Sequence, residues 1–257
     1  MMRFKSLGSG SSGNATLVQV SGPDACNVLI DCGFGLRQLL QRLEYSGVLP
    51  DQLDAIFITH EHSDHTGCVQ TLSKQYNIPV WMSLGTATAM GFVNTTNMLH
   101  TASDGDVIGI KSLQLRPFTV PHDAREPLQL TCTDGGSKLG VLSDLGHATA
   151  HVIAELQGCN ALMLECNHDA DLLSASNYPN FLKVRISGEY GHLANVQSAN
   201  IARAVLHTGL KHVVAVHLSH QNNLPELVKN SLSEALSCSS DEIIIATQDA
   251  GSPWLDI

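Results

Sequence analysis

The sequence lacks the features that direct a chain into or across a membrane. Its amino-terminal residues contain no basic segment followed by a long apolar core, and no later apolar run reaches the roughly 18 residues that a spanning helix needs. Charged residues are also scarce, at 15% of the chain against 43% hydrophobic residues, which allows a large core. We therefore expect a globular, soluble, cytoplasmic protein that does not bind a membrane.

Paired cysteine motifs and repeats are absent as well. The seven cysteines include no C-x-x-C pair, and an odd number without an export signal argues against a disulfide framework. We expect reduced thiols, most of them buried as small apolar residues. No fixed-period repeat or long linker interrupts the sequence, so we expect a single domain over residues 1–257.

Basic residues are few: 14 Lys and Arg stand against 24 Asp and Glu, for a formal net charge of −10. This charge opposes a polyanionic partner, because nucleic-acid binding usually depends on clustered Lys and Arg. Two bound divalent cations would add about four positive charges and reverse the sign locally. The 13 histidines are more informative, since neutral imidazole is the commonest metal ligand.

Apolar and β-branched runs between polar turns predict nine strands, at residues 15–20, 27–31, 55–59, 78–82, 112–120, 138–143, 161–165, 212–217 and 242–247. Amphipathic patterns predict four helices, at residues 36–45, 65–76, 196–208 and 224–237. Strands that alternate with helices in this order fit two sheets packed face to face with helices outside. We therefore predict the α/β class and a four-layer αββα sandwich.

The densest group of metal-binding residue types follows the predicted strand 55–59. Four ligand types fall within six residues, at His60, His62, Asp64 and His65. At a strand end, positions 60 and 62 point to one side while positions 64 and 65 turn away, so two adjacent ions can share the segment. The alternative interpretation, a solvated polar loop, does not explain why four ligand types occur together. The segment therefore predicts a centre for two divalent ions.

The same segment matches the H-x-H-x-D-H signature of the metallo-β-lactamase superfamily, which the chain resembles along nearly its whole length. Residues 29–33 look like the family's early strand, with Asp31 expected to hold the metal loop in place. The resemblance implies two ion sites with room for a bridging hydroxide and a substrate oxygen. Their ligands would be His60, His62 and His122 for one ion, Asp64, His65 and His217 for the other, and Asp144 between both. His220 is the alternative to His217, and manganese, zinc or iron all suit these ligands.

Asp144 helps to choose the reaction. The zinc β-lactamases have a cysteine at the corresponding position, whereas an aspartate is typical of the family's phosphodiesterases, nucleases and thioesterases. Residues 191–219 resemble ribonuclease Z, in which a histidine opening the equivalent helix assists the leaving group. His192 is therefore expected to act as a general acid or to contact phosphate, with Asp64 as a proton relay; a helix-capping histidine is the alternative.

Residues 6–14, 165–169 and 217–223 resemble the bacterial YycJ/WalJ group. This implies a manganese-dependent 5′-to-3′ exonuclease on double-stranded DNA, with a suggested place in repair. The alternatives are a small-molecule (cyclic) phosphodiesterase, an RNA-processing nuclease, a non-nuclease metallo-hydrolase and a metal-containing binding or redox module. No protein partner or oligomeric state can be inferred.

The Gly/Ser-rich stretch at residues 8–13 permits two interpretations: a flexible turn, or a set of backbone amides that receives an anion. Under the second interpretation a 5′-phosphate binds among Ser9, Ser11, Ser12 and Asn14. His168 is expected either to line the substrate pocket or to order its own loop.

Overall fold

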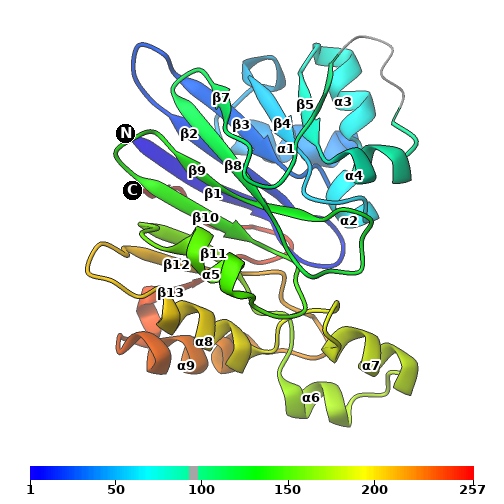
Figure 1. Cartoon of the computed structure of the whole chain (residues 1–257), viewed down its shortest axis with the longest axis vertical. Helices are drawn as coiled ribbons and strands as arrows, with labels where there is room; N and C mark the ends of the chain where they lie inside the picture. The colour runs from blue at the N-terminus through cyan, green and yellow to red at the C-terminus, as the bar shows by residue number, and fades with distance from the viewer. Residues whose placement is uncertain (93–97) are drawn as a thin grey trace.

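The computed structural model describes residues 1–92 and 98–257. Within this part of the chain, two seven-stranded sheets pack face to face, and helices cover their outer faces (Figure 1). The predicted α/β class and the four-layer αββα arrangement are therefore confirmed. No helix among the described residues is long and apolar enough to cross a lipid bilayer.

The amino-terminal sheet begins with antiparallel strands and continues with parallel ones. Its strands, in spatial order, are β14 (Leu255–Asp256), β1 (Met2–Gly8), β2 (Ala15–Val20), β3 (Cys26–Ile30), β4 (Ala55–Phe57), β5 (Val80–Met82) and β6 (Leu99–Thr101). The helices of this half are α1 (Leu36–Tyr45), α2 (Ser63–Thr66), α3 (Val69–Tyr76) and α4 (Leu84–Ala89), with a 3-10 turn at Pro50–Gln52. Helix α1 buries Leu39 and Leu43, which are four residues apart and so share one face.

The second sheet contains β13 (Ile243–Ile245), β12 (His212–Val216), β11 (Ala161–Glu165), β10 (Lys138–Leu142), β9 (Leu128–Thr133), β8 (Leu113–Thr119) and β7 (Ile108–Ile110). Helices α5 (Ala150–Leu156), α8 (Asn195–Ala204) and α9 (Pro225–Leu236) pack on its outer face, and a 3-10 turn spans Ser240–Glu242. Helices α6 (Ala170–Ala175) and α7 (Asn180–Ser187) project at one end of the molecule (Figure 1). Strands β10, β11 and β12 run parallel, so their carboxyl ends lie at one edge.

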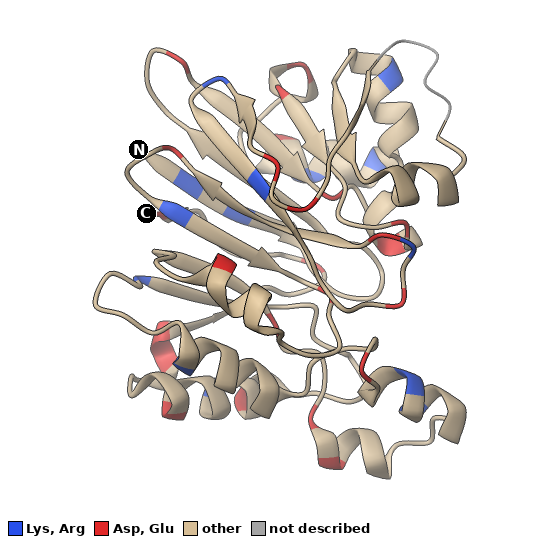
Figure 2. Ribbon diagram, in the orientation of Figure 1, with Lys and Arg blue, Asp and Glu red and all other residues tan. Residues whose placement is uncertain are grey.

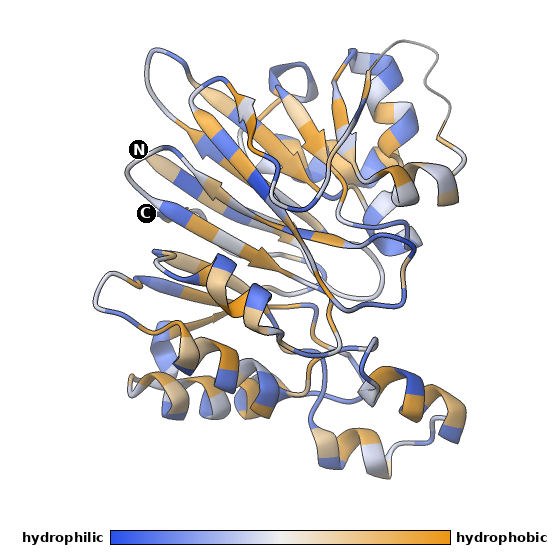
Figure 3. Ribbon diagram, viewed as in Figure 1, coloured by the Kyte–Doolittle hydropathy of each residue, from blue (hydrophilic) through white to orange (hydrophobic). Residues whose placement is uncertain are grey.

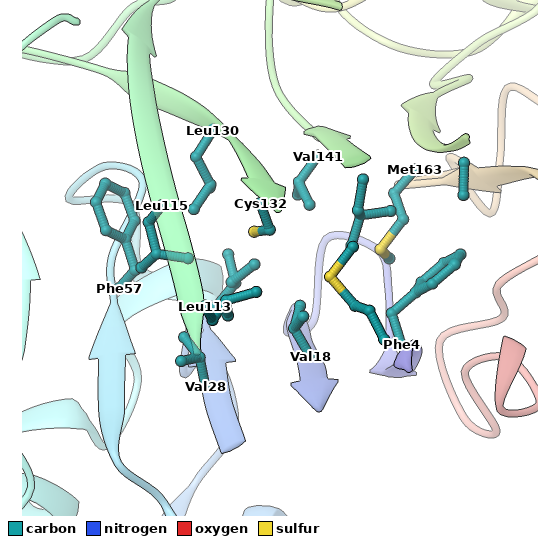
Figure 4. Close-up of a cluster of buried hydrophobic side chains, with 14 of the residues drawn as sticks. Phe4, Val18, Val28, Phe57, Leu113, Leu115, Leu130, Cys132, Val141 and Met163 are labelled. Atoms are coloured by element: carbon teal, nitrogen blue, oxygen red, sulfur yellow. The ribbon is translucent and has the colours of Figure 1, made fainter. Parts of the chain in front are cut away.

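Apolar side chains from the two sheets meet in a central core. Figure 4 shows Phe4, Val18 and Val28 of the first sheet near Leu113 and Met163 of the second. All of these side chains are at most 2% exposed, which is the burial expected of a close-packed interior. Six of the seven cysteines are buried, and all seven, which lie within the described residues, are free thiols, as predicted.

All nine predicted strands exist and end within two residues of the predicted limits. Five further strands, β1, β6, β7, β9 and β14, were not predicted. Strand β9, with the sequence LQLTCT, was missed although it alternates apolar and polar residues; its polar residues Gln129 and Thr131 are buried as well. The predicted helix at 65–76 is wrong in one respect: it is divided at Gly67. There φ is 23° and a Cβ would lie 2.5 Å from the carbonyl oxygen of Cys32, so only glycine fits.

Candidate metal centre

The predicted ligands come together at the carboxyl ends of strands from both sheets. Asp31 follows β3, the segment of residues 60–65, whose last three residues belong to α2, follows β4, and Asp144 follows β10. Glu165 ends β11 and His217 follows β12. In mixed α/β sheets this edge is where ligands commonly bind, because the connecting loops leave it open.

Three histidines form the first group of converging nitrogen atoms. His60 Nε2 lies 3.1 Å from His62 Nδ1, which lies 3.3 Å from His122 Nε2. Burial, together with the nearby His65, lowers the pKa of His60 well below its ordinary value. Burial also lowers the pKa of His122. Three imidazole nitrogens that converge in this way suit a shared cation, so this group can hold a divalent ion.

Asp64, His65 and His217 form the second group. Asp64 Oδ2 is 3.5 Å from His65 Nε2 and 3.5 Å from His217 Nε2. Burial opposes the ionised form of Asp64, but His217 and His65 outweigh it and lower the pKa of this carboxyl. An ionised carboxylate between two ring nitrogens is a donor set that suits zinc, manganese or iron.

Asp144 lies between the two groups. Its Oδ1 is 2.8 Å from His217 Nδ1, and its Oδ2 is 3.0 Å from His65 Nε2 but has no hydrogen-bond partner among the described residues. The side chain is 1% exposed. Burial raises the pKa of Asp144, yet the charges of His217 and His65 prevail and hold this pKa well below its usual range. A buried carboxylate oxygen without a hydrogen-bond donor fits a residue that completes its coordination with a cation.

Asp31 holds His65 in orientation. Its Oδ2 is 2.7 Å from His65 Nδ1, and its Oδ1 accepts hydrogen bonds from the backbone N–H and the hydroxyl of Thr59. Burial alone would lower the pKa of His65, but the carboxylates of Asp31 and Asp144 raise it well above its ordinary value. Because Nδ1 faces Asp31, Nε2 faces the cluster. A carboxylate behind a ligating histidine commonly fixes the tautomer in this way.

Two of the residues predicted to bind a 5′-phosphate are engaged inside the protein. The Ser9 hydroxyl donates to Asn14 Oδ1 at 3.0 Å and accepts from His217 N–H at 2.8 Å. Asn14 Nδ2 lies 3.3 Å from Asp64 Oδ2 and 3.1 Å from His65 Nε2. Ser9 and Asn14 therefore position ligands from the interior. Ser11 and Ser12 are exposed, and for these two residues the contact with a 5′-phosphate stays a prediction.

Gly33 permits the close contact between the loops that carry the ligands. A Cβ on Gly33 would lie 1.7 Å from the carbonyl oxygen of Asp64 and 2.7 Å from the backbone nitrogen of Asn14. These two backbone atoms are hydrogen-bonded to each other at 2.8 Å. The loop itself would have to move to admit a side chain.

Replacing Gly33 by Ala is expected to lower both the free energy of unfolding and the affinity for divalent ions. Overpacking of a close contact typically costs about 1–3 kcal/mol, and we expect the upper end because the clash is with backbone. Denaturant unfolding and metal titration measure the two effects. Gly35→Ala is the matched control, since φ is −63° there and nothing lies within 4 Å of an added Cβ. Equal losses in the two variants would contradict the explanation.

His192 lies against a buried acid that sequence reasoning did not assign a role. Its Nδ1 is 2.7 Å from Glu165 Oε1 and 3.3 Å from Asp144 Oδ1. Glu165 Oε2 accepts hydrogen bonds from the backbone N–H groups of Leu145 and Leu193, which fixes the carboxylate. Burial opposes the charged form of His192, but Glu165 and Asp144 raise the pKa of His192 to about 9.

Helix α8 begins at Asn195, one residue before the predicted start at 196, and ends at Ala204, four residues before the predicted end at 208; His192 lies three residues before the helix. The predicted strand ends gave a signal for Glu165: like Asp144 and His217, it lies at the carboxyl end of a parallel strand. A charged residue in that position, after four buried apolar residues, marks the edge where ligands gather.

Of the remaining predicted histidines, one lies in the cluster of potential ligands and two lie outside it. His217, at the end of β12 with φ of 55°, lies in the cluster, whereas His220 is exposed and outside the four groups of potential ligands found among the described residues. His168 is 2% exposed and bridges to Ala194 through its backbone. It does not line the pocket at the cluster, and its Nδ1 has no hydrogen-bond partner among the described residues.

A pocket of about 190 Å³ opens at the cluster. Predicted site residues line it: Ser11, His62, Asp64, Asp144, His192 and His217. Two residues that sequence reasoning missed, Asp123 and Arg185, also line it and form an ion pair in which Arg185 Nε lies 2.6 Å from Asp123 Oδ2. Asp123 Oδ1 lies 3.5 Å from His122 Nε2. The pocket thus gives a bound molecule access to both ligand groups, with a cation beside them.

Comparison with known proteins agrees with this geometry. The Beta-lactamase superfamily domain matches residues 26–218. The chain is 31% identical over 238 residues to Exodeoxyribonuclease YycJ of Bacillus anthracis, which covers 91% of this chain and 89% of that protein. It is 28% identical over 241 residues to Exodeoxyribonuclease WalJ of Streptococcus pneumoniae, covering 91% and 88%.

A solved structure gives the same fold. The metallo-beta-lactamase fold protein YhfI from Bacillus subtilis matches with a TM-score of 0.76 and 15% identity, over 100% of both chains. At this identity the likeness concerns the fold alone. Together with the match over residues 26–218, it identifies the chain as a member of the β-lactamase superfamily domain family.

Proposed function

We propose that the chain is a metal-dependent phosphodiester hydrolase that acts as a 5′-to-3′ exonuclease on double-stranded DNA. One feature carries the hydrolase assignment: two groups of metal-binding side chains lie side by side with Asp144 between them, and His62 of one group and Asp64 and His217 of the other line the same pocket. The choice of DNA is supported by the similarity to two proteins named exodeoxyribonucleases.

We assign the ligands of each ion from the groups of side chains whose ligand atoms converge. His60, His62 and His122 would hold one divalent ion, and Asp64, His65 and His217 the other, with Asp144 shared. Manganese or zinc is proposed, and iron suits the same donors. When bound, two such ions activate a water molecule and stabilise charge on the phosphoryl oxygens.

The remaining residues of the pocket would orient the substrate and move protons. His192, held at Nδ1 by Glu165, presents its other nitrogen for donation of a proton to the leaving sugar oxygen. Asp64, which also lines the pocket, would act together with His192 as a proton relay. The net charge of −10 opposes binding of a polyanion, but the positive charges of bound metal ions would make the pocket attractive to phosphate even on an acidic protein.

The direct test supplies metal-defined protein with end-labelled duplex DNA, single-stranded DNA, RNA and bis(p-nitrophenyl) phosphate, each with Mn²⁺ or Zn²⁺. We expect mononucleotides to be released from the 5′ end of the duplex. Labelling the two ends separately distinguishes this from 3′-to-5′ or internal cleavage. Hydrolysis of the small ester without cleavage of DNA would reject the proposal.

That outcome would favour a small-molecule phosphodiesterase, for which two observations speak. The pocket of about 190 Å³ is small, and the net charge of −10 opposes binding of a long polyanion. A cyclic nucleotide added to the same assay tests this alternative directly.

Recognition of a 5′-phosphate gives a separate prediction. Wild-type protein is expected to prefer 5′-phosphorylated over 5′-hydroxyl duplexes, and a Ser11→Ala, Ser12→Ala variant should lose most of that preference. Each lost hydrogen bond to a charged group removes about 1.5–3 kcal/mol, a factor of roughly ten or more. Ser21→Ala is the control, since Ser21 is exposed and follows the far end of β2. An identical preference in wild type and double variant would reject a role for these two serines.

A further inference from the structure

Helix α7 contains four large apolar residues among its eight but has no buried residue. Phe181 is 75% exposed and Val184 is 70% exposed, and Tyr190, just after the helix, is 60% exposed. Figure 3 shows apolar colour on α6 and α7 although both project from the body. Large apolar side chains gathered on one short exposed segment are a mark of a binding surface.

This segment is continuous with the pocket. Leu182, Arg185 and Ile186 of α7 line it together with the predicted ligands. The backbone N–H of His192 donates to the carbonyl oxygen of Ile186 at 2.8 Å, and Arg185 is paired with Asp123. The carboxyl end of α7 is therefore fixed to the site, while Phe181 at its other end faces solvent.

The pocket is too small for more than a short piece of a polymer. Its volume of about 190 Å³ lies below the roughly 300–1,000 Å³ of pockets that enclose a whole ligand. Units next to a scissile phosphodiester must therefore lie outside the pocket, on the surface around it. Helix α7 and Tyr190 form part of that surface, since Gly191 after Tyr190 lines the pocket as well.

The chemistry of the segment suits unpaired nucleotides. Phe181 and Arg185 are four residues apart and so are neighbours on the helix surface. Arg185 is the one Lys or Arg among the residues that line the pocket in the described structure, and Figure 2 shows basic residues on α7. Only its Nε has a hydrogen-bond partner among the described residues, which leaves the remaining N–H groups for a phosphate. Aromatic rings beside a cation are the usual means of holding a single strand.

A second copy of this chain suits the segment less well. A stable protein interface needs about 800 Å² and 20–30 residues from each partner. Here the exposed large apolar side chains of the segment are three: Phe181, Val184 and Tyr190. Two separate aromatic rings flanking a pocket fit stacking with individual bases better than they fit an extended interface.

We propose that α7 and Tyr190 bind the unpaired nucleotides next to the scissile bond, with Phe181 and Tyr190 stacking on bases and Arg185 contacting a phosphate. This inference rests on the proposed nuclease function. Phe181, Arg185 and Tyr190 would then position the DNA strand without being metal ligands. Substitutions at these residues should therefore weaken binding of the strand and leave the chemical step unchanged.

The test compares Phe181→Ala and Tyr190→Ala with wild type on two substrates, a 5′-phosphorylated duplex and bis(p-nitrophenyl) phosphate. The quantity measured is kcat/KM for DNA divided by kcat/KM for the small ester. Loss of a stacked base should reduce this ratio by about 5- to 100-fold, chiefly through KM for DNA. A variant that simply folds poorly loses activity on both substrates and keeps the ratio.

Two further variants sharpen the result. Tyr45→Ala is the matched control, because Tyr45 is an aromatic residue 84% exposed at the end of α1 and away from the pocket. It should keep the wild-type ratio. Phe181→Leu keeps an apolar side chain but removes the ring, so it should lose as much as Phe181→Ala. A wild-type ratio in Phe181→Leu would overturn base stacking.

The outcomes separate this inference from the function on which it rests. Wild-type protein that hydrolyses only the small ester would overturn the nuclease function and this inference with it. DNA cleavage with an unchanged ratio in both alanine variants would overturn the inference alone. Light scattering completes the test: a dimer that Phe181→Ala converts to a monomer, with an unchanged ratio, would assign α7 to a second copy.

Discussion

The His65→Ala variant is expected to lose at least about three orders of magnitude in phosphodiester hydrolysis. His65 Nε2 faces Asp64 and Asp144, so its removal opens the second ligand group and leaves Asp144 Oδ2 without its nearest neighbour. Two-metal sites supply several kcal/mol of transition-state stabilisation, and each 1.4 kcal/mol is a factor of ten in rate. The measurement is kcat/KM with the metal content of the purified variant.

Loss of activity must be distinguished from loss of the fold. Removing the ring takes away one of the two partners of Asp31 Oδ2 and leaves the Thr59 hydroxyl as the other, and the loss of a hydrogen bond to a buried carboxylate costs about 1–3 kcal/mol. Thermal unfolding is therefore measured beside activity, and we expect a lowered but cooperative transition. Full activity in a folded His65→Ala protein with no metal added to the assay would refute the two-metal proposal.

His220→Ala is the matched control for the ligand assignment. His220 lies three residues after His217, is exposed, and belongs to none of the groups of potential ligands in the described part of the chain. His220→Ala should therefore keep both ions, whereas His217→Ala should lose one. The reverse pattern would exchange the two assignments.

The sequence predicts the local part of this centre well because that part is local. His60 and His62 lie on the loop after β4, and Asp64 and His65 lie in the short helix α2 that follows at once, so closeness in the chain brings the four side chains together. The side chains of His122, Asp144 and His217 come from three other loops that only the pairing of β10, β11 and β12 and the packing of the two sheets bring together. Those residues could be chosen only through the resemblance to a known family.

Residues that act through close backbone contacts were not predictable in the same way. Ser9 and Asn14 were expected to bind substrate, but the loop folds inward and their polar groups meet His217 and Asp64. The reason is Gly33, whose missing side chain lets the backbones of residues 14 and 64 approach. A glycine in a sequence shows that such an approach is allowed, and does not show which segment makes it.

Helices α6 and α7 were also missed, and their composition explains the omission. Helix α7 has apolar and polar residues intermixed around its circumference and buries none, so it has no amphipathic pattern to detect. A helix of eight residues is also too short to be stable alone, so its packing against the site at Gly191 and His192 holds it in place.

Removing the imidazole of His192 is expected to reduce DNA cleavage by about 10²- to 10⁴-fold, the usual contribution of a positioned general acid. The ring is partly exposed to the pocket and is held by Glu165 at Nδ1, so its other nitrogen is free to donate a proton. The carboxylate accepts at Nδ1, which keeps a proton on that nitrogen. The raised pKa, about 9, means that the ring carries a second proton at neutral pH.

Two substrates with different leaving groups distinguish the possible roles of His192. A sugar hydroxyl is a poor leaving group that needs a proton, whereas p-nitrophenolate departs without one. A proton donor therefore matters much less for bis(p-nitrophenyl) phosphate, and His192→Ala should lose far more activity on DNA than on that ester. Equal losses on both substrates would instead assign His192 to phosphate binding, and no loss on either would leave it a purely structural residue.

Glu165→Gln tests the assignment of His192 as a general acid by changing the residue that holds its ring. The amide keeps an oxygen that can accept from His192 Nδ1 but removes the charge that favours the protonated ring, and changes of this kind typically cost about 10- to 100-fold. We expect this loss to depend on the leaving group as in His192→Ala. Because Glu165 Oε1 is also 3.3 Å from His217 Nδ1, metal content must be measured in parallel. A variant that keeps both ions and loses activity equally on both substrates would contradict a role through His192.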